Sequence, residues 1–256
     1  MTKLQELDLE IEYDSEEDDV VNSFFVPVLS AGTSYKRLAG YFSSQALAIV
    51  GRGIKELLKN GGTMQLVCGH QFTQKDKEAL ESGSEAKDLS TDFINKLDEL
   101  SDDDFRKQHV QIMGLMIANK KLEIKIADVP AGSGIFHQKI GIISDGSDTI
   151  SFVGSINETA NALLENTENF DVHKSWTQGG TDAERVRRHE GRFDKYWADE
   201  GTSTKVYSLP EAIKKKLLQI AKDVEIKYQA RQPTPRNDLW EHQEEAITAW
   251  KPCATT

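Results

Sequence analysis

A histidine and a lysine separated by one residue, His137 and Lys139, are the residues whose types and spacing first suggest chemistry in this chain. The alternating pattern around them predicts a strand, which would place both side chains on one face. Imidazole is a nucleophile and proton carrier near neutral pH, and an ammonium group attracts anions. An H-x-K triplet is nevertheless common by chance, and a strand histidine is more often structural than catalytic.

Two later segments supply the donors and the carboxylate that a phosphate-cleaving site needs. The next predicted strand ends in GSINET, which places Ser155 and Asn157 at a turn, and Glu168 opens the strand after that. One nucleophile, one cation, two neutral donors and one carboxylate would then converge on adjacent strands. This set suits a phosphodiester, where charge must be neutralised, a nucleophile supplied and the leaving group protonated.

The segments FHQK, VGSINET and ENTENFDV together resemble the H-x-K, G-S-x-N and downstream Glu signature of the phospholipase D superfamily, in particular its single-motif nuclease branch. The spacing is similar too, with Asn157 eighteen residues after Lys139 and Glu168 eleven after Asn157. The upstream segments AGYFSSQAL and LVCGH also look like the N-terminal half of such domains. The resemblance therefore covers most of residues 20–200.

The chain departs from the fuller family motif at one position. That motif carries an aspartate five residues beyond the lysine, whereas this chain has Ser144 there and Asp145 one place later. Nuclease members of the superfamily also lack this aspartate. The departure therefore counts against a lipase more than against catalysis.

The resemblance implies a metal-independent phosphodiester hydrolase that needs no cofactor. His137 would attack phosphorus and form a phosphohistidine, while Lys139 and Asn157, helped by Ser155, would hold the non-bridging oxygens. Glu168 would orient the imidazole and favour its protonated form.

The family uses two such motifs, and this sequence contains one. Because a second histidine must act as acid and then as base toward water, we expect two chains to pair across a two-fold axis. Each would contribute one His137 to a site at the subunit interface. The predicted partners are thus a second copy of the chain and a nucleic acid, with DNA favoured.

The charge distribution leaves room for a nucleic-acid surface on an acidic protein. The formal net charge of −11 argues against a generic nucleic-acid coat, and eight acidic residues lie between Asp8 and Asp19. The basic residues that we expect to contact substrate are Lys120, Lys121, Arg185 and Arg188. The alternative, that these are solvated helix faces, stays open.

Neither export nor membrane insertion is expected. The chain has no run of 18 apolar residues, and its N-terminus lacks the basic and then apolar layout of a signal peptide. We therefore predict a cytoplasmic protein with no membrane partner. Cys68 and Cys253 lie far apart without CxxC spacing, which predicts free thiols and no metal site.

The elements around these residues predict an α/β fold. Residues 43–62 show helical spacing between the apolar runs 37–43 and 63–69, which indicates a βαβ unit. We expect a mixed, mostly parallel central sheet flanked by helices. The further predicted strands are 122–129, 134–144, 149–155 and 169–176, and the further predicted helices are 20–32, 74–118, 157–168 and 181–199.

Four segments divide the chain in this interpretation. They are an acidic N-terminal segment (1–19), the phospholipase D-like domain (20–208), a helix and linker (209–232) and a C-terminal fragment (233–256). The last resembles the opening of superfamily 2 helicases, with Gln243 in the place of an adenine-recognising glutamine, so a helicase partner or fusion is expected. A plain C-terminal helix is the open alternative, and no GxxxxGK[ST] phosphate loop follows.

Three functions are compatible with these patterns. The favoured one is a DNA endonuclease in restriction or antiphage defence. A phospholipid hydrolase or transferase of the same superfamily is the second. A non-catalytic nucleic-acid-binding module is the third, and the intact set of His137, Lys139, Asn157 and Glu168 weighs against it.

Overall fold

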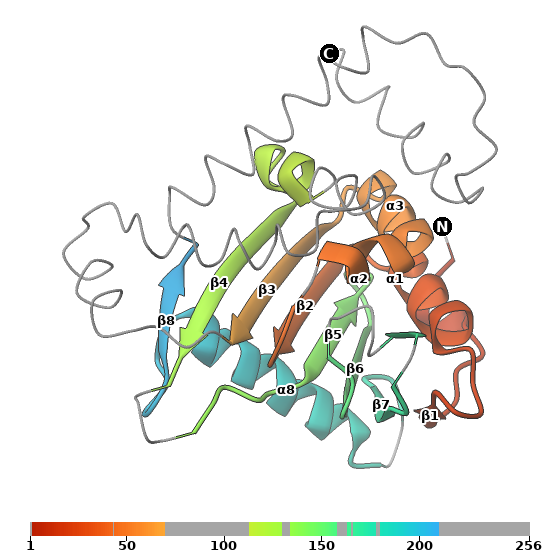
Figure 1. Ribbon diagram of the computed structural model, residues 1–256. Helices are drawn as coiled ribbons and strands as arrows, with labels where there is room; N and C mark the ends of the chain where they lie inside the picture. Colours follow the sequence, from red (N-terminus) through yellow and green to blue (C-terminus); the bar gives the residue numbers. More distant parts are fainter. Residues whose placement is uncertain are drawn as a thin grey trace, which may run out of the picture.

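A single eight-stranded sheet forms the centre of the computed structural model (Figure 1). The residues that the structure describes are 2–42, 44–69, 113–129, 134–157, 163–164, 166–177 and 180–209. Most of the predicted helix 74–118, part of the predicted helix 157–168 and nearly all of the segments 209–232 and 233–256, including Gln243, lie outside these residues.

The strands run in the order β1-β7-β6-β5-β2-β3-β4-β8 across the sheet (Figure 1). Their bounds are Glu12–Asp14 (β1), Ser34–Ala39 (β2), Thr63–Gly69 (β3), Leu122–Asp128 (β4), Ile140–Ser144 (β5), Thr149–Gly154 (β6), Asn169–Lys174 (β7) and Lys205–Ser208 (β8). The predicted strands 63–69, 122–129, 149–155 and 169–176 are confirmed to within two residues.

The sheet is mixed, as predicted, but the expectation of mostly parallel pairing is wrong. Only the pairs β2–β3 and β3–β4 are parallel, and the other five pairs of the described strands are antiparallel. A short connection explains one of the antiparallel pairs, β5–β6, whereas the strands of β1–β7, β2–β5 and β4–β8 lie far apart in the sequence. Strands joined by only a few residues, such as β5 and β6, pair as antiparallel hairpins, whereas a parallel pair needs a crossover.

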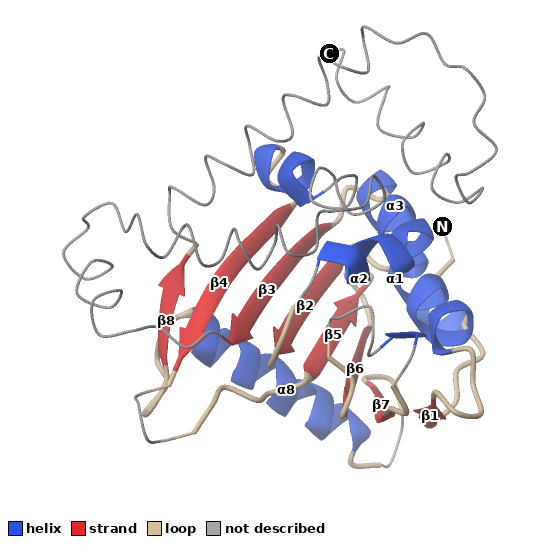
Figure 2. Cartoon of the chain, in the orientation of Figure 1, coloured by secondary structure: helices blue, strands red, loops and turns tan. Residues whose placement is uncertain are grey.

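Helices cover both faces of the sheet (Figure 2). On one face lie a π-helical turn (η2, Val21–Phe25) and the helices α1 (Val26–Ala31), α2 (Ser44–Ile49) and α3 (Gly51–Lys59). The long helix α8 (Asp182–Trp197) crosses the other face. The predicted helices 20–32, 43–62 and 181–199 are thus confirmed, although the second is broken at Val50.

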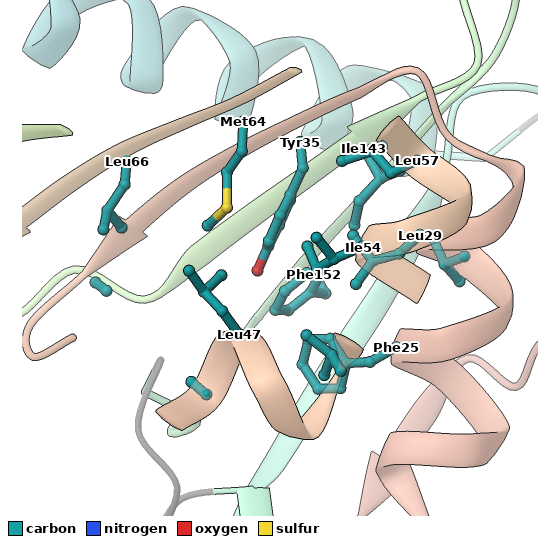
Figure 3. Packing of buried hydrophobic residues seen from close by; sticks show 14 of the residues in the cluster. Phe25, Leu29, Tyr35, Leu47, Ile54, Leu57, Met64, Leu66, Ile143 and Phe152 are labelled. Atoms are coloured by element: carbon teal, nitrogen blue, oxygen red, sulfur yellow. The ribbon is translucent and has the colours of Figure 1, made fainter. Parts of the chain in front are cut away.

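The larger core fills the space between the sheet and the helices η2, α1, α2 and α3 (Figure 3). Leu29, Leu47 and Leu57 of the helices pack against Tyr35 and Ile143 of the sheet. Burying each such side chain contributes about 1.5–3 kcal/mol. An aromatic cluster continues this core toward β7 through Tyr13, Phe24, Phe25, Phe152 and Phe170.

The acidic N-terminal segment belongs to the sheet and is not separate from the domain that we expected to begin at residue 20. The strand β1 pairs antiparallel with β7, and Leu4, Leu9 and Tyr13 are buried. The acidic side chains around them hid this apolar pattern, since edge strands often carry charge on their solvent side. A short 3-10 turn (η1, Leu4–Glu6) precedes the strand.

Candidate active site at one edge of the sheet

The segments that carry the predicted site residues meet at one edge of the sheet. The strands β2, β3 and β6 end at this edge, and β5 and β7, which run in the opposite direction, begin there. The segments that follow or precede these five neighbouring strands therefore lie together, at the edge where the arrowheads of β2 and β3 point in Figure 1. Such edges are where α/β folds usually place their chemistry.

His137 and Lys139 lie in the segment that leads into β5, so the prediction of a strand over 134–144 is wrong for its first half. Residues 134–139 belong to no helix or strand, and β5 begins at Ile140. The two side chains differ in environment, because His137 is exposed whereas Lys139 is buried. A nucleophile must reach its substrate, and the position of His137 meets that condition.

Gly40, directly after β2, brings His137 and Asn157 together. A Cβ atom built on Gly40 would lie 3.0 Å from His137 Cδ2 and 3.3 Å from Asn157 Oδ1. Both side chains therefore approach the same point from opposite segments of the chain. Glycine is required here for space, since any side chain would push against one of the two.

Asn157 is held by the backbone at the end of β2. The amide of Tyr41 donates a hydrogen bond to Asn157 Oδ1 over 3.2 Å, and this bond leaves the side-chain NH2 group as a donor. The preceding carbonyl, that of Ile156, accepts a hydrogen bond from Arg37 Nη2 over 2.5 Å. The predicted phosphate-binding amide thus occupies a defined position.

Lys139 lies in a charged environment within the protein. Burial lowers the pKa of its ammonium group, the nearby Arg37 lowers it further, and the carboxylate of Glu168 opposes both effects. Glu168 and Lys139 are each 9 % exposed, so their attraction is only weakly screened by water. The fold therefore brings Lys139 and Glu168, which lie far apart in the sequence, within electrostatic reach of each other.

Glu168 is fixed by the N-terminal segment. Its backbone amide donates to Ser15 Oγ over 2.8 Å, and its carbonyl accepts from the Ser15 amide over 2.9 Å. Its carboxylate accepts a hydrogen bond from Asn166 Nδ2 over 3.2 Å. In the described part of the chain Glu168 interacts with Lys139 and Asn166, and the implied contact with the imidazole of His137 is not among its bonds.

Ser155 connects two backbone segments of the candidate site. Its Oγ accepts a hydrogen bond from the Asn169 amide over 3.1 Å and lies 3.4 Å from the Asn169 carbonyl. This joins the end of β6 to the start of β7. The help with phosphate oxygens that we expected from Ser155 stays a prediction, and Ser155 is exposed at this edge.

The four basic residues predicted to bind substrate lie away from this edge. Lys120 and Lys121 precede β4 and so sit at the opposite edge, where Lys121 Nζ donates to the Gly61 carbonyl over 3.0 Å. Arg185 and Arg188 are exposed on α8, behind the sheet, and Arg188 pairs with Glu184 over 2.8 Å. A contact with distant parts of a long substrate stays a prediction for all four.

A second histidine cluster lies on the α8 face, away from the site. His173 Nδ1 is 3.2 Å from Asp182 Oδ1, and its ring centroid is 5.7 Å from that of His189. His189 Nδ1 is 2.9 Å from Ser151 Oγ. His173 points to the α8 side of the sheet, and Val172, the residue before it on β7, points to the opposite side.

Sequence reasoning missed two residues of the candidate site, Gly40 and Arg37. A signal for each was present, because Arg37 is a charged residue inside the apolar run 37–43 and Gly40 follows directly after its core positions. Charged residues are almost never fully buried unless they are paired. A charge within an apolar run therefore indicates a position where the fold supplies specific partners.

Neither a metal-ligand cluster nor a membrane span occurs among the described residues. Within them, three or more His, Cys, Asp or Glu side chains do not gather as a metal site would require. None of the described helices is long and apolar enough to cross a membrane. Cys68 is a buried free thiol, as predicted, whereas Cys253 lies outside the described residues.

Comparison with known proteins places the chain in a family. The family described as cardiolipin synthase, PLD-like domain, matches residues 29–197, a stretch that contains His137, Lys139, Asn157 and Glu168. Among functionally curated proteins, no match was found.

Several solved structures are similar over most of the chain. NucT from Helicobacter pylori is 18% identical with a TM-score of 0.45, over 77% of this chain and 97% of that one. Nuc from Salmonella typhimurium, a phospholipase D family member, is 15% identical with a TM-score of 0.42 over the same shares. Phosphatidylserine synthase from Haemophilus influenzae is 13% identical with a TM-score of 0.43, over 85% of this chain and 46% of that one.

These identities and TM-scores are too low to support an argument about substrate, so the family match carries the assignment. It spans more than half of the chain and includes the whole sheet edge described above. The predicted superfamily, its mixed α/β fold and its class of chemistry, phosphodiester cleavage, are confirmed. The chain belongs to the PLD-like domain family of the phospholipase D superfamily.

Proposed function

We propose that this protein is a metal-independent phosphodiesterase that cleaves DNA through a phosphohistidine intermediate and works as a homodimer. The observation that carries the proposal is the meeting of His137 and Asn157 at Gly40, beside the buried pair of Lys139 and Glu168. An exposed nucleophile and an amide donor meet at this point, and we assign the cation of the reaction to Lys139, two residues after His137. This is the minimum that attack on a phosphodiester requires.

In the first step an imidazole nitrogen of His137 attacks phosphorus, and the bond from phosphorus to the leaving oxygen breaks. The NH2 group of Asn157 and the ammonium group of Lys139 stabilise the negative charge that builds on the non-bridging oxygens. The leaving oxygen takes a proton from a second imidazole. Because the chain supplies one H-x-K motif, that imidazole comes from His137 of the partner subunit.

In the second step water attacks the phosphohistidine. The same second imidazole, now neutral, accepts a proton from the water as the new phosphorus–oxygen bond forms. The phosphorus–nitrogen bond breaks, and His137 returns to its starting state. Atoms and charge therefore balance with one water consumed for each bond cleaved.

Nucleic acid is the favoured substrate because the motif pattern resembles the nuclease branch. Ser144 stands where lipases carry an aspartate, and in the fold Ser144 bonds to the Asp148 carbonyl at the opposite edge of the sheet. The proposed setting is restriction or antiphage defence with a helicase partner. That setting rests on the likeness of residues 233–256 to a helicase opening.

A phospholipid hydrolase or transferase is the second candidate, and one specific observation favours it. The matching family is named for cardiolipin synthase, an enzyme of lipid metabolism. The reacting group would again be a phosphodiester, so the chemistry of His137 and Lys139 would be unchanged. The two candidates differ in what surrounds the phosphate.

One pair of assays separates these candidates. Supercoiled plasmid and phosphatidylglycerol vesicles are each incubated with the protein in EDTA, and nicking or headgroup release is measured. We expect nicking alone. Release of headgroup without nicking would establish the lipid enzyme, activity restored only by magnesium would contradict the metal-independent step, and inactivity on both would support the non-catalytic module.

The intermediate and the dimer are tested directly. After a short reaction with ³²P-labelled DNA and an acid-free quench, the label should remain on the wild-type protein and be absent from His137→Ala. Sedimentation should give a dimer at the concentrations of the assay. A monomer that cleaves at full rate would overturn the shared-site arrangement.

A further inference from the structure

Arg37 is a fully buried charged residue on β2, directly beneath the sheet edge that carries the candidate site. Moving a guanidinium group out of water is unfavourable, and good contacts must offset this. The side chain of the preceding residue, Lys36, lies on the opposite face of the sheet, where it faces α8 and pairs with Asp194. Arg37 faces the other side, toward the site.

A glycine on the next strand makes space for the aromatic ring against which Arg37 packs. Gly141 is paired in register with Arg37 on one side and with Phe152 on the other. A Cβ atom on Gly141 would lie 2.0 Å from the Phe152 ring, so the ring lies across the glycine. The guanidinium carbon then rests 4.8 Å from the centroid of that ring.

This packing directs one end of the guanidinium group at the turn after β6. Arg37 Nη2 donates to the Ile156 carbonyl over 2.5 Å, and that carbonyl belongs to the peptide bond that leads into Asn157. Asn157 is therefore restrained on both sides, through its backbone by Arg37 and through its side chain by the Tyr41 amide. An amide that must meet a phosphate oxygen gains from being fixed in advance.

We propose that Arg37 is a positioning residue of the active site, which holds the Ile156 carbonyl and thereby sets Asn157 for a phosphate oxygen. The chemical consequence rests on the proposed function, whereas the positioning itself rests on the contacts alone. The two are therefore tested by separate measurements.

The first measurement needs no substrate. Amide hydrogen exchange is followed by NMR in the wild type, Arg37→Met, Arg37→Lys and the control Lys36→Met, which removes the adjacent charge on the opposite face. Loosening of the turn should speed exchange of the Tyr41 amide by at least about tenfold in Arg37→Met, while the amides of the β2–β3 ladder keep their protection. Lys36→Met should leave the Tyr41 amide unchanged.

The second measurement is cleavage kinetics on DNA. Arg37→Met should lower kcat by about 10- to 100-fold with little change in KM. The reason is that a misplaced Asn157 amide weakens mainly the contact to the phosphate oxygen that forms in the transition state. Arg37→Lys should fall between Arg37→Met and the wild type, since lysine keeps the charge but not the fork of donors.

The pH profile gives a readout that a purely structural role would not move. Lys139 is faced by Arg37 from β2 and by Glu168 from the start of β7, with His137 on its own segment. Removing the positive charge in Arg37→Met should shift the alkaline limb of the kcat profile, where Lys139 loses its proton, to higher pH. Arg37→Lys should leave that limb in place.

The outcomes separate the two proposals. If the wild type cleaves no DNA, the proposed function fails, and the Tyr41 exchange rate still decides the role of Arg37. If Arg37→Met and Arg37→Lys both keep the wild-type exchange rate and kcat, the positioning role is overturned. Should Arg37→Met fail to fold, the comparison of Arg37→Lys with Lys36→Met carries the test.

Discussion

Two regions of this protein combine histidine with hydrogen-bonding partners, on opposite faces of one sheet. In the candidate active site His137 is exposed and stands beside Asn157 at the edge of the sheet. In the second cluster His173 and His189 are buried between the sheet and α8, with Asp182 and Ser151 as their partners. The residue types are similar, and the difference lies in access.

That difference decides what each histidine does. Burial lowers the pKa of His189 to about 4, and the neighbouring His173, Arg192 and Arg185 add to this lowering, so its imidazole stays neutral in ordinary conditions. Its Nδ1 is already engaged by Ser151. We infer that this cluster fixes α8 to the sheet, whereas His137 keeps a ring that a substrate can reach.

The sharpest test of the comparison exchanges one histidine in each region. His137→Ala should lower DNA cleavage by at least about 10³-fold, because the nucleophile is lost, with no change in the melting temperature. His173→Ala should keep the kcat of the folded protein while lowering its stability. The measurements are plasmid nicking and thermal unfolding of the same preparations.

The opposite result would break the comparison. Cleavage lost in His173→Ala at temperatures where that variant is folded would mean that the α8 face takes part in the reaction. Normal cleavage by His137→Ala would remove the nucleophile from the proposal.

The second prediction concerns the pH dependence of stability. The unfolded chain binds a proton at His189 once the pH falls below about 6.5, whereas the folded protein does not until about pH 4. As the pH is lowered from about 6.5 to about 4, the free energy of unfolding should therefore fall, and His189 should account for on the order of 3 kcal/mol of the loss. Glutamine does not titrate, so the free energy of unfolding of His189→Gln should fall by correspondingly less over the same pH range.

Urea unfolding of both proteins at intervals from pH 7 to pH 4 measures this. The relevant quantity is the difference between the two curves, because carboxylates such as Asp145 and Glu184 contribute equally to both. Curves that stay parallel throughout would show that His189 is not the group that titrates.

A third prediction tests the meeting point of the candidate site. Gly40→Ala introduces a Cβ 3.0 Å from His137 and 3.3 Å from Asn157, so one of the two must shift by a few tenths of an ångström. We expect cleavage to fall by about tenfold while the melting temperature changes little. Gly51→Ala is the matched control, since its Cβ would meet nothing within 4 Å. Equal rates in the two variants would argue that the site tolerates displacement at Gly40.

The smallest expected effect is at Ser151. Ser151→Ala removes the hydroxyl partner of His189 and leaves a buried ring nitrogen without it, which should cost about 1–3 kcal/mol of unfolding free energy. Cleavage should be unchanged, and Ser203→Ala, an exposed position, serves as control. A loss of kcat in Ser151→Ala would connect the two histidine regions and contradict their separation.

The local sequence pattern was enough to predict several helices and strands and to single out candidate site residues. Apolar periodicity located the strand 63–69 and the helix 181–199, and the H-x-K and G-S-x-N spacing was enough to single out His137, Lys139 and Asn157. These predictions succeed because neighbouring residues decide an element's period and a motif's spacing. The same pattern failed at the acidic N-terminus, where β1 owes its place to pairing with β7.

Only the tertiary structure decided which of those residues meet. Sequence spacing could not show that His137 and Asn157 meet at Gly40, that Ser155 bonds to Asn169, or that His173 faces α8. The charge of Arg37 within an apolar run indicated partners in the fold, but not that one of them is the Ile156 carbonyl. Each of these depends on strand order and direction, which bring together residues far apart in the chain. The sequence alone therefore indicates which residues could react, but the pairing of β2 with β5 and of β5 with β6 brings those residues together.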